Sequence, residues 1–181
     1  SSNKDIWSKK AIILKELKNY DEAIKAYTKA IESDLANPDL LKEKGELLLL
    51  KERYKEALSC YDRLLELNPS SKDGWCKKAF SLKELGRYKE AITCYDKAIE
   101  LSQKNSDLWN GKGLCLIKEK SYEEALKCYD KVLEFSPNDV SAWYYRGFAL
   151  ASTGKYDEAL KSYDKVLSLD PHNTLASKAR E

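Results

Sequence analysis

Length, composition and charge already restrict what this chain can be. Its 181 residues are 43% apolar and 34% charged, which is enough chain to bury a core. The 32 basic and 30 acidic side chains leave a net charge of only +2, so composition indicates neither a nucleic-acid-binding patch nor an acidic tail. No apolar run is long enough for a membrane helix or a secretory signal, so we predict a cytoplasmic protein without membrane insertion.

The chain repeats itself every 34 residues. Rows that begin at residues 4, 38, 72, 106 and 140 align without a gap through residue 173, and positions are counted within these rows. Position 4 is large and apolar, position 8 is small and position 11 is leucine. The residues are Trp7, Leu41, Trp75, Trp109 and Trp143, then Ala11, Gly45, Ala79, Gly113 and Gly147, then Leu14, Leu48, Leu82, Leu116 and Leu150. Helical geometry places these positions on one face, which predicts a first helix in each row.

The second half of each row predicts a second helix. Tyrosine at position 17, glutamate at 19, alanine at 20 and tyrosine at 24 recur in all five rows. The glutamates suit a first helical turn, and Ser121 with Glu124 has the spacing of a capping box. Proline follows this helix in three rows, while Gly86 and Gly154 lie where the two helices of a row must turn. We expect the recurring tryptophans and tyrosines to belong to the core.

These spaced residues resemble the tetratricopeptide repeat family. The resemblance gives five repeats, at 4–37, 38–71, 72–105, 106–139 and 140–173, and a stub of a sixth first helix or a partial capping helix at 174–181. It implies an all-α fold, a right-handed α-solenoid of tandem helix–turn–helix repeats whose concave side is lined by the first helices. Such proteins bind extended peptides or other proteins there. Because the chain starts with Ser1-Ser2 and stops within a row, we expect a fragment of a longer protein.

Three kinds of position depart from the family pattern. Leu41 replaces tryptophan, and Leu35 and Gln103 replace the closing proline. Position 7 carries a cation in every row where leucine is more usual; the residues are Lys10, Lys44, Lys78, Lys112 and Arg146. We expect their stems to pack over the core while the charges reach water. The candidate acidic partners are Asp62, Asp96, Asp130 and Asp164.

A second stripe on the first helices, at positions 2, 5, 9 and 12, is not needed by the scaffold. It is mostly polar in the first two rows, and apolar or aromatic residues accumulate in the last three. We predict that a groove patch of these residues binds a peptide or partner; its members are Phe80, Asn110, Leu114, Ile117, Tyr144 and Phe148. The alternatives are that Tyr145 and Phe148 seal the last helix pair, or that the rest of a longer protein covers them.

The five cysteines show no pairing pattern. Cys60, Cys94 and Cys128 recur 34 residues apart, which predicts unlinked thiols on the outer side of successive second helices. Cys115 is expected in the core and Cys76 in the groove. No ligand spacing for a metal is present, so we predict five reduced cysteines and no bound metal.

The sequence favours a non-enzymatic scaffold for protein–protein interaction. A single histidine, His172, and the lack of a Gly-rich phosphate loop argue against catalysis and against a cofactor. Two alternatives stay open: an RNA-binding helical-repeat array, against which the acidic residues at position 2 count, and a regulatory or targeting domain of a longer enzyme. We expect no nucleic acid as partner. Self-association through the ends of the array is a further possibility.

Overall fold

The computed structural model describes residues 3–180, and all the regular structure in that range is α-helical. Residues 1, 2 and 181, which include the end of the expected stub, lie outside it. The helices are α1 (Asn3–Glu16), α2 (Tyr20–Ser33), α3 (Pro38–Leu50), α4 (Tyr54–Leu67), α5 (Lys72–Glu84), α6 (Tyr88–Leu101), α7 (Ser106–Lys118), α8 (Tyr122–Phe135), α9 (Val140–Ser152), α10 (Tyr156–Leu169) and α11 (Thr174–Arg180). Two helices therefore fall in each 34-residue row, as predicted.

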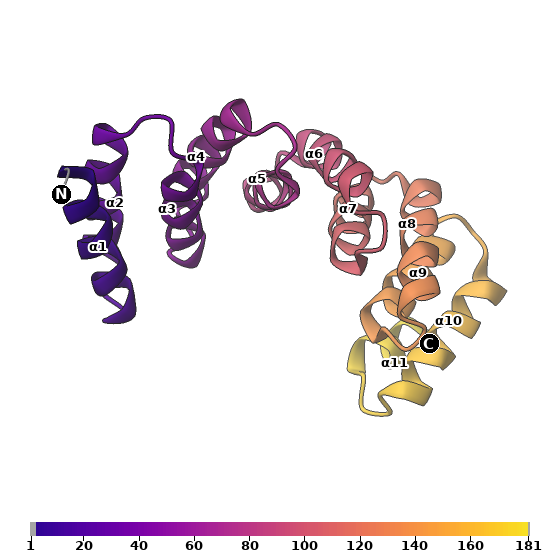
Figure 1. The fold of residues 1–181 in the computed structure, drawn as a ribbon. Helices are drawn as coiled ribbons and strands as arrows, with labels where there is room; N and C mark the ends of the chain where they lie inside the picture. The colour runs from indigo at the N-terminus through magenta and orange to yellow at the C-terminus, as the bar shows by residue number, and fades with distance from the viewer. Residues whose placement is uncertain (1–2, 181) are drawn as a thin grey trace. The chain divides into compact units, whose positions relative to one another are not determined.

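The chain forms two compact units, each described by itself. The first ends at Arg87 and contains α1 to α5, and the second begins at Tyr88 and contains α6 to α11. Within each unit every helix packs against the next one along the chain (Figure 1). The all-α prediction is confirmed, and the exact repeat boundaries stay a prediction.

The turn inside each row requires a left-handed backbone at position 15. Gly86 and Gly154 have φ values of 74° and 79°, so the two predicted glycine turns are confirmed. Lys18, Glu52 and Lys120 adopt positive φ at the same position in the other rows. In every row the next amide donates to the carbonyl five residues earlier, the bond that closes a Schellman turn.

Side chains cap four of the first helices, whereas α2, α4, α8 and α10 have no side-chain cap. Asn37, Ser71, Asn105 and Asp139 accept hydrogen bonds from the backbone amides that begin α3, α5, α7 and α9. The capping box predicted at Ser121 is wrong, because its hydroxyl makes no capping bond. The left-handed turn leaves Ser121 with ψ near 66°, outside the extended backbone of the capped residues.

The core is built on contacts between the position-24 tyrosines and the small residues at position 8. Tyr61 and Tyr129 are fully buried. A Cβ added at Gly113 would lie 2.8 Å from Tyr129 Cζ, and one at Gly147 would lie 2.7 Å from Tyr163 Cε1. At these two glycines an added Cβ would collide with the tyrosine ring, which explains why position 8 is small.

The position-17 tyrosines are less buried than expected. Tyr54 and Tyr122 are half-buried, each covered edge-on by a phenylalanine of the following first helix. Tyr156 is 68% exposed, so its assignment to the core is wrong. The seven-residue helix α11 offers no counterpart to that phenylalanine; it packs on α10 mainly through Ala176.

Ion pairs link successive rows at the cations of position 7. Lys78 lies 2.7 Å from Asp62, and Arg146 lies 2.8 Å from Asp130. Lys112 with Asp96, and Arg180 with Asp164, repeat the arrangement in the second unit. Asp62, Asp96 and Asp130 are therefore confirmed as partners of the predicted cations, whereas Asp164 pairs with Arg180, which was not among them. Lys78 and Arg146 also lie over the rings of Trp75 and Trp143, so their stems do cover the core.

The prediction that Cys60, Cys94 and Cys128 lie on an outer surface is wrong. All three are buried, as is Cys115, and Cys76 is half-buried. The structure joins none of the five cysteines in a disulfide, and their reduced state stays a prediction. Position 23 adjoins the tyrosine of position 24, so these small side chains fill the space between helices rather than facing water; Cys60 and Cys128 belong to the apolar clusters of their units.

Replacing Gly147 with leucine should force α9 away from Tyr163 and destabilise the fold by about 1–3 kcal/mol, the usual scale of overpacking. The matched control is Ser152→Leu, which adds the same side chain at an exposed site of α9. Chemical denaturation measures both. Equal stability of Gly147→Leu and the wild type would contradict the close approach.

Thiol labelling should follow burial. In native protein at pH 8 we expect Cys76 to react first, because burial raises the pKa of Cys128 to about 11 and leaves about one thiol in a thousand ionised. All five should react after unfolding. In the unfolded chain the Cys128 thiol ionises near pH 9, whereas in the folded protein it stays neutral up to about pH 11. The free energy of unfolding should therefore decrease as the pH rises from about 9 towards 11. Fast native labelling of Cys128 would contradict its burial.

Candidate functional site

Two contacting first helices of the second unit carry most of the predicted patch. Asn110, Leu114 and Ile117 lie on α7 with spacings of four and three residues, and Tyr144 and Phe148 lie four residues apart on α9. Each set therefore occupies one face of its helix. Helices α7 and α9 touch each other within the unit. We call these five residues the α7/α9 face.

The five residues of this face differ in solvent exposure. Phe148 is 37% exposed, and the other four are half-buried. The Phe148 ring meets Tyr122 edge-on, with 6.2 Å between ring centroids. Tyr122 was treated as scaffold by its position in the repeat, so the sequence analysis missed it as a neighbour of this face.

Tyr144 also serves the packing of the last helix pair. Its ring lies 5.9 Å from that of Tyr163 and 5.3 Å from that of Tyr145. Tyr145 in turn stacks on the buried Tyr129 at 5.6 Å with an interplanar angle of 16°. Tyr144 therefore helps to seal the last helix pair, Tyr145 packs on α8 of the preceding row, and Phe148 keeps a larger exposed surface.

Phe80 belongs to the first unit, whereas the other five residues belong to the second. It repeats the geometry of Phe148, meeting Tyr54 edge-on with 6.3 Å between centroids. The Lys83 ammonium lies 4.8 Å above its ring. Phe80 thus has its own aromatic and cationic neighbours on α4 and α5.

The same stripe is mostly polar in the first two rows, and two of its lysines form ion pairs. The Lys15 ammonium on α1 lies 2.6 Å from a Glu43 oxygen on α3, and Lys42 on α3 lies 2.8 Å from Asp73 on α5. The hydrogen bond to Glu43 raises the pKa of Lys15 and keeps it charged. These pairs join consecutive first helices.

A cleft opens between α1 and α3 beside the Lys15–Glu43 pair. Its volume is about 350 Å³, and its lining residues are Ser8, Ile12, Lys15, Glu16, Tyr27, Asp39, Leu40 and Glu43. Three positions of the predicted stripe, at Ser8, Ile12 and Lys15, face it from α1. The Tyr27 hydroxyl donates a 3.4 Å hydrogen bond to Glu43, and burial raises the pKa of that tyrosine to about 12. We call this cavity the α1/α3 cleft.

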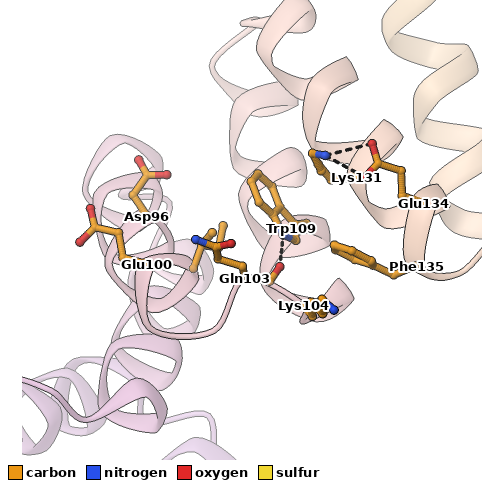
Figure 2. A pocket seen from close by; sticks show the side chains of 9 residues that line it. Asp96, Glu100, Gln103, Lys104, Trp109, Lys131, Glu134 and Phe135 are labelled. Atoms are coloured by element: carbon orange, nitrogen blue, oxygen red, sulfur yellow. Dashed lines mark hydrogen bonds and ion pairs between the residues drawn. The ribbon is translucent and has the colours of Figure 1, made fainter.

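A larger cleft, of about 590 Å³, lies in the second unit among α6, α7 and α8. Trp109 stands in its middle, with Asp96 and Glu100 on one side and Lys131 on the other (Figure 2). Lys131 pairs with Glu134 at 2.7 Å, and the Trp109 indole N–H donates to the Gln103 carbonyl oxygen at 2.9 Å. The sequence analysis missed this cleft, because its residues count individually as scaffold or as departures from the repeat.

The described residues hold no group of three potential metal ligands among histidine, cysteine and carboxylate side chains. No helix in residues 3–180 combines the length and the apolar character that a membrane crossing requires.

Solved structures share this fold. YrrB, described as a TPR protein with an unusual peptide-binding site, is 26% identical with a TM-score of 0.88; the match covers 96% of this chain and 90% of that one. A MamA structure is 21% identical with a TM-score of 0.89, covering 93% and 92%. MamA from Desulfovibrio magneticus is 16% identical with a TM-score of 0.87, covering 96% and 98%. The MamA likenesses show the fold alone.

Sequence comparison gives the same assignment from independent data. No curated protein sequence matches the chain significantly. Family profiles described as tetratricopeptide repeat match residues 9–72, 76–140 and 113–181, which together span nearly the whole chain. The helix pairs, the recurring tyrosine contacts and these matches agree, and the chain belongs to the tetratricopeptide repeat family.

Proposed function

We propose that the α7/α9 face binds an apolar or aromatic segment of a partner protein. Membership of the tetratricopeptide repeat family makes this domain a protein-interaction module. The observation that carries the finer proposal is the exposed ring of Phe148 beside four uncharged, half-buried side chains on two contacting helices. An apolar surface of this kind on a water-facing helix is typical of contact sites.

The chemistry of the face supports an apolar ligand rather than a charged one. Asn110 and Tyr144 are the members with hydrogen-bonding side chains, and none of the five is a lysine, arginine, aspartate or glutamate. The rings of Tyr144 and Phe148 can bury a large area at a low cost in conformational entropy, as the aromatic residues of interface hot spots do. The peptide-binding site named for YrrB supports a peptide ligand in this fold.

Truncating Phe148 to alanine should weaken partner binding by about 2 kcal/mol, the scale of an interface hot spot. Folding should change much less, because the ring is partly exposed in the free protein. Affinity capture from the source cell with mass spectrometry identifies the partner, and calorimetry then measures its affinity for each variant. Leu160→Ala is the matched control, since Leu160 is similarly exposed but lies on α10.

Tyr144→Ala should lower affinity on the same scale but should also lower the melting temperature, because that ring packs on Tyr163 and Tyr145. Unchanged affinity in both Phe148→Ala and Tyr144→Ala would remove the α7/α9 face as the binding site. Binding to RNA oligonucleotides with an affinity that falls steeply with salt would instead indicate phosphate contacts and an RNA ligand.

A further inference from the structure

The α1/α3 cleft of the first unit carries an excess of negative charge. Glu16, Asp39 and Glu43 line it, and Lys15 is the one cation among its lining residues. Glu46 adds to the field, since its charge acts on both Lys15 and Tyr27. An incoming cation therefore meets net attraction.

The cleft's own lysine does not neutralise this charge fully. The Lys15 ammonium lies 2.6 Å from Glu43, the carboxylate that also accepts a hydrogen bond from Tyr27. The hydrogen bond between Lys15 and Glu43 raises the pKa of Lys15, so this lysine is already paired with one carboxylate of the cleft. Within the described part of the chain, Glu16 and Asp39 have no ion-pair partner. Two lining carboxylates on different helices are thus available to a ligand.

The cleft also offers apolar surface and one unsatisfied polar atom. Ile12 is exposed and lines the cleft together with the buried Leu40. The Ser8 hydroxyl oxygen is buried and has no hydrogen-bond partner, a situation that costs free energy. A single χ1 rotation redirects a serine hydroxyl, so it can accept a hydrogen bond from a donor in the cleft.

We propose that the α1/α3 cleft binds an arginine side chain of a partner protein segment. The aliphatic stem packs on Ile12, while the guanidinium lies between Asp39 and Glu16 with the Ser8 hydroxyl as a further acceptor. A guanidinium suits this site better than an ammonium, because its planar fork of five N–H donors can reach acceptors on two helices at once. This recognition is independent of the α7/α9 face, which is uncharged.

The test uses capped pentapeptides that carry one central residue between alanines: arginine, lysine, citrulline or norleucine. Citrulline keeps the stem and shape of arginine but removes the charge. We expect the arginine peptide to shift the backbone amide NMR signals of Ser8, Ile12 and Leu40, and to bind at least about fivefold more tightly than citrulline or norleucine. Raising the salt concentration should weaken the arginine peptide selectively.

Variants locate the site. Glu16→Gln with Asp39→Asn should reduce arginine-peptide affinity about fivefold, whereas Glu32→Gln, at an exposed carboxylate of α2 outside the cleft, should not. Asp39 lies in the first turn of α3, so circular dichroism is used to check that the double variant keeps its helix content. The single variant Glu16→Gln tests the site without a change in α3. Absence of arginine binding, equal binding of citrulline, or an unchanged affinity in the double variant would overturn the proposal. None of these outcomes bears on the α7/α9 face.

Discussion

The contact between a buried tyrosine and a residue too small to obstruct it is the constraint on which this structure depends. It sets how closely the two helices of a row approach, as at Gly113 against Tyr129 and Gly147 against Tyr163. Interiors are packed to near-crystalline density, so such a contact tolerates little change in volume. Positions 2, 5, 9 and 12 of each first helix lie outside this contact. Their side chains can therefore vary between rows without disturbing the packing of the two helices.

Charge is distributed over these faces in a way that separates two surfaces. In the first unit, carboxylates and lysines pair across consecutive first helices and leave an acidic surplus at the α1/α3 cleft. In the second unit, several of the corresponding positions are apolar or aromatic, and Lys112 and Arg146 form ion pairs at position 7 instead. One repeat scaffold thus carries two chemically different surfaces.

Aromatic residues at neighbouring positions of a first helix have different surroundings. The burial of each one therefore follows from the structure and not from the sequence pattern. Tyr144 and Tyr145 are adjacent in sequence, yet Tyr145 stacks on the core tyrosine Tyr129 while Phe148 keeps an exposed ring. An aromatic side chain on a first helix can either fill the space beside the position-24 tyrosine or face outward. Only the packing of the neighbouring helix decides which of the two occurs.

The sequence by itself determined the helices, their pairing and the small residues at position 8, because a 34-residue period repeats the same packing requirement in every row. It also indicated the acidic partners of the position-7 cations and most of the α7/α9 face. Tertiary structure alone decided the burial of Cys60, Cys94 and Cys128, the exposure of Tyr156 and the existence of the two clefts. These features depend on which neighbouring helix covers a position, and helical periodicity fixes a residue's direction on its own helix without fixing what lies opposite.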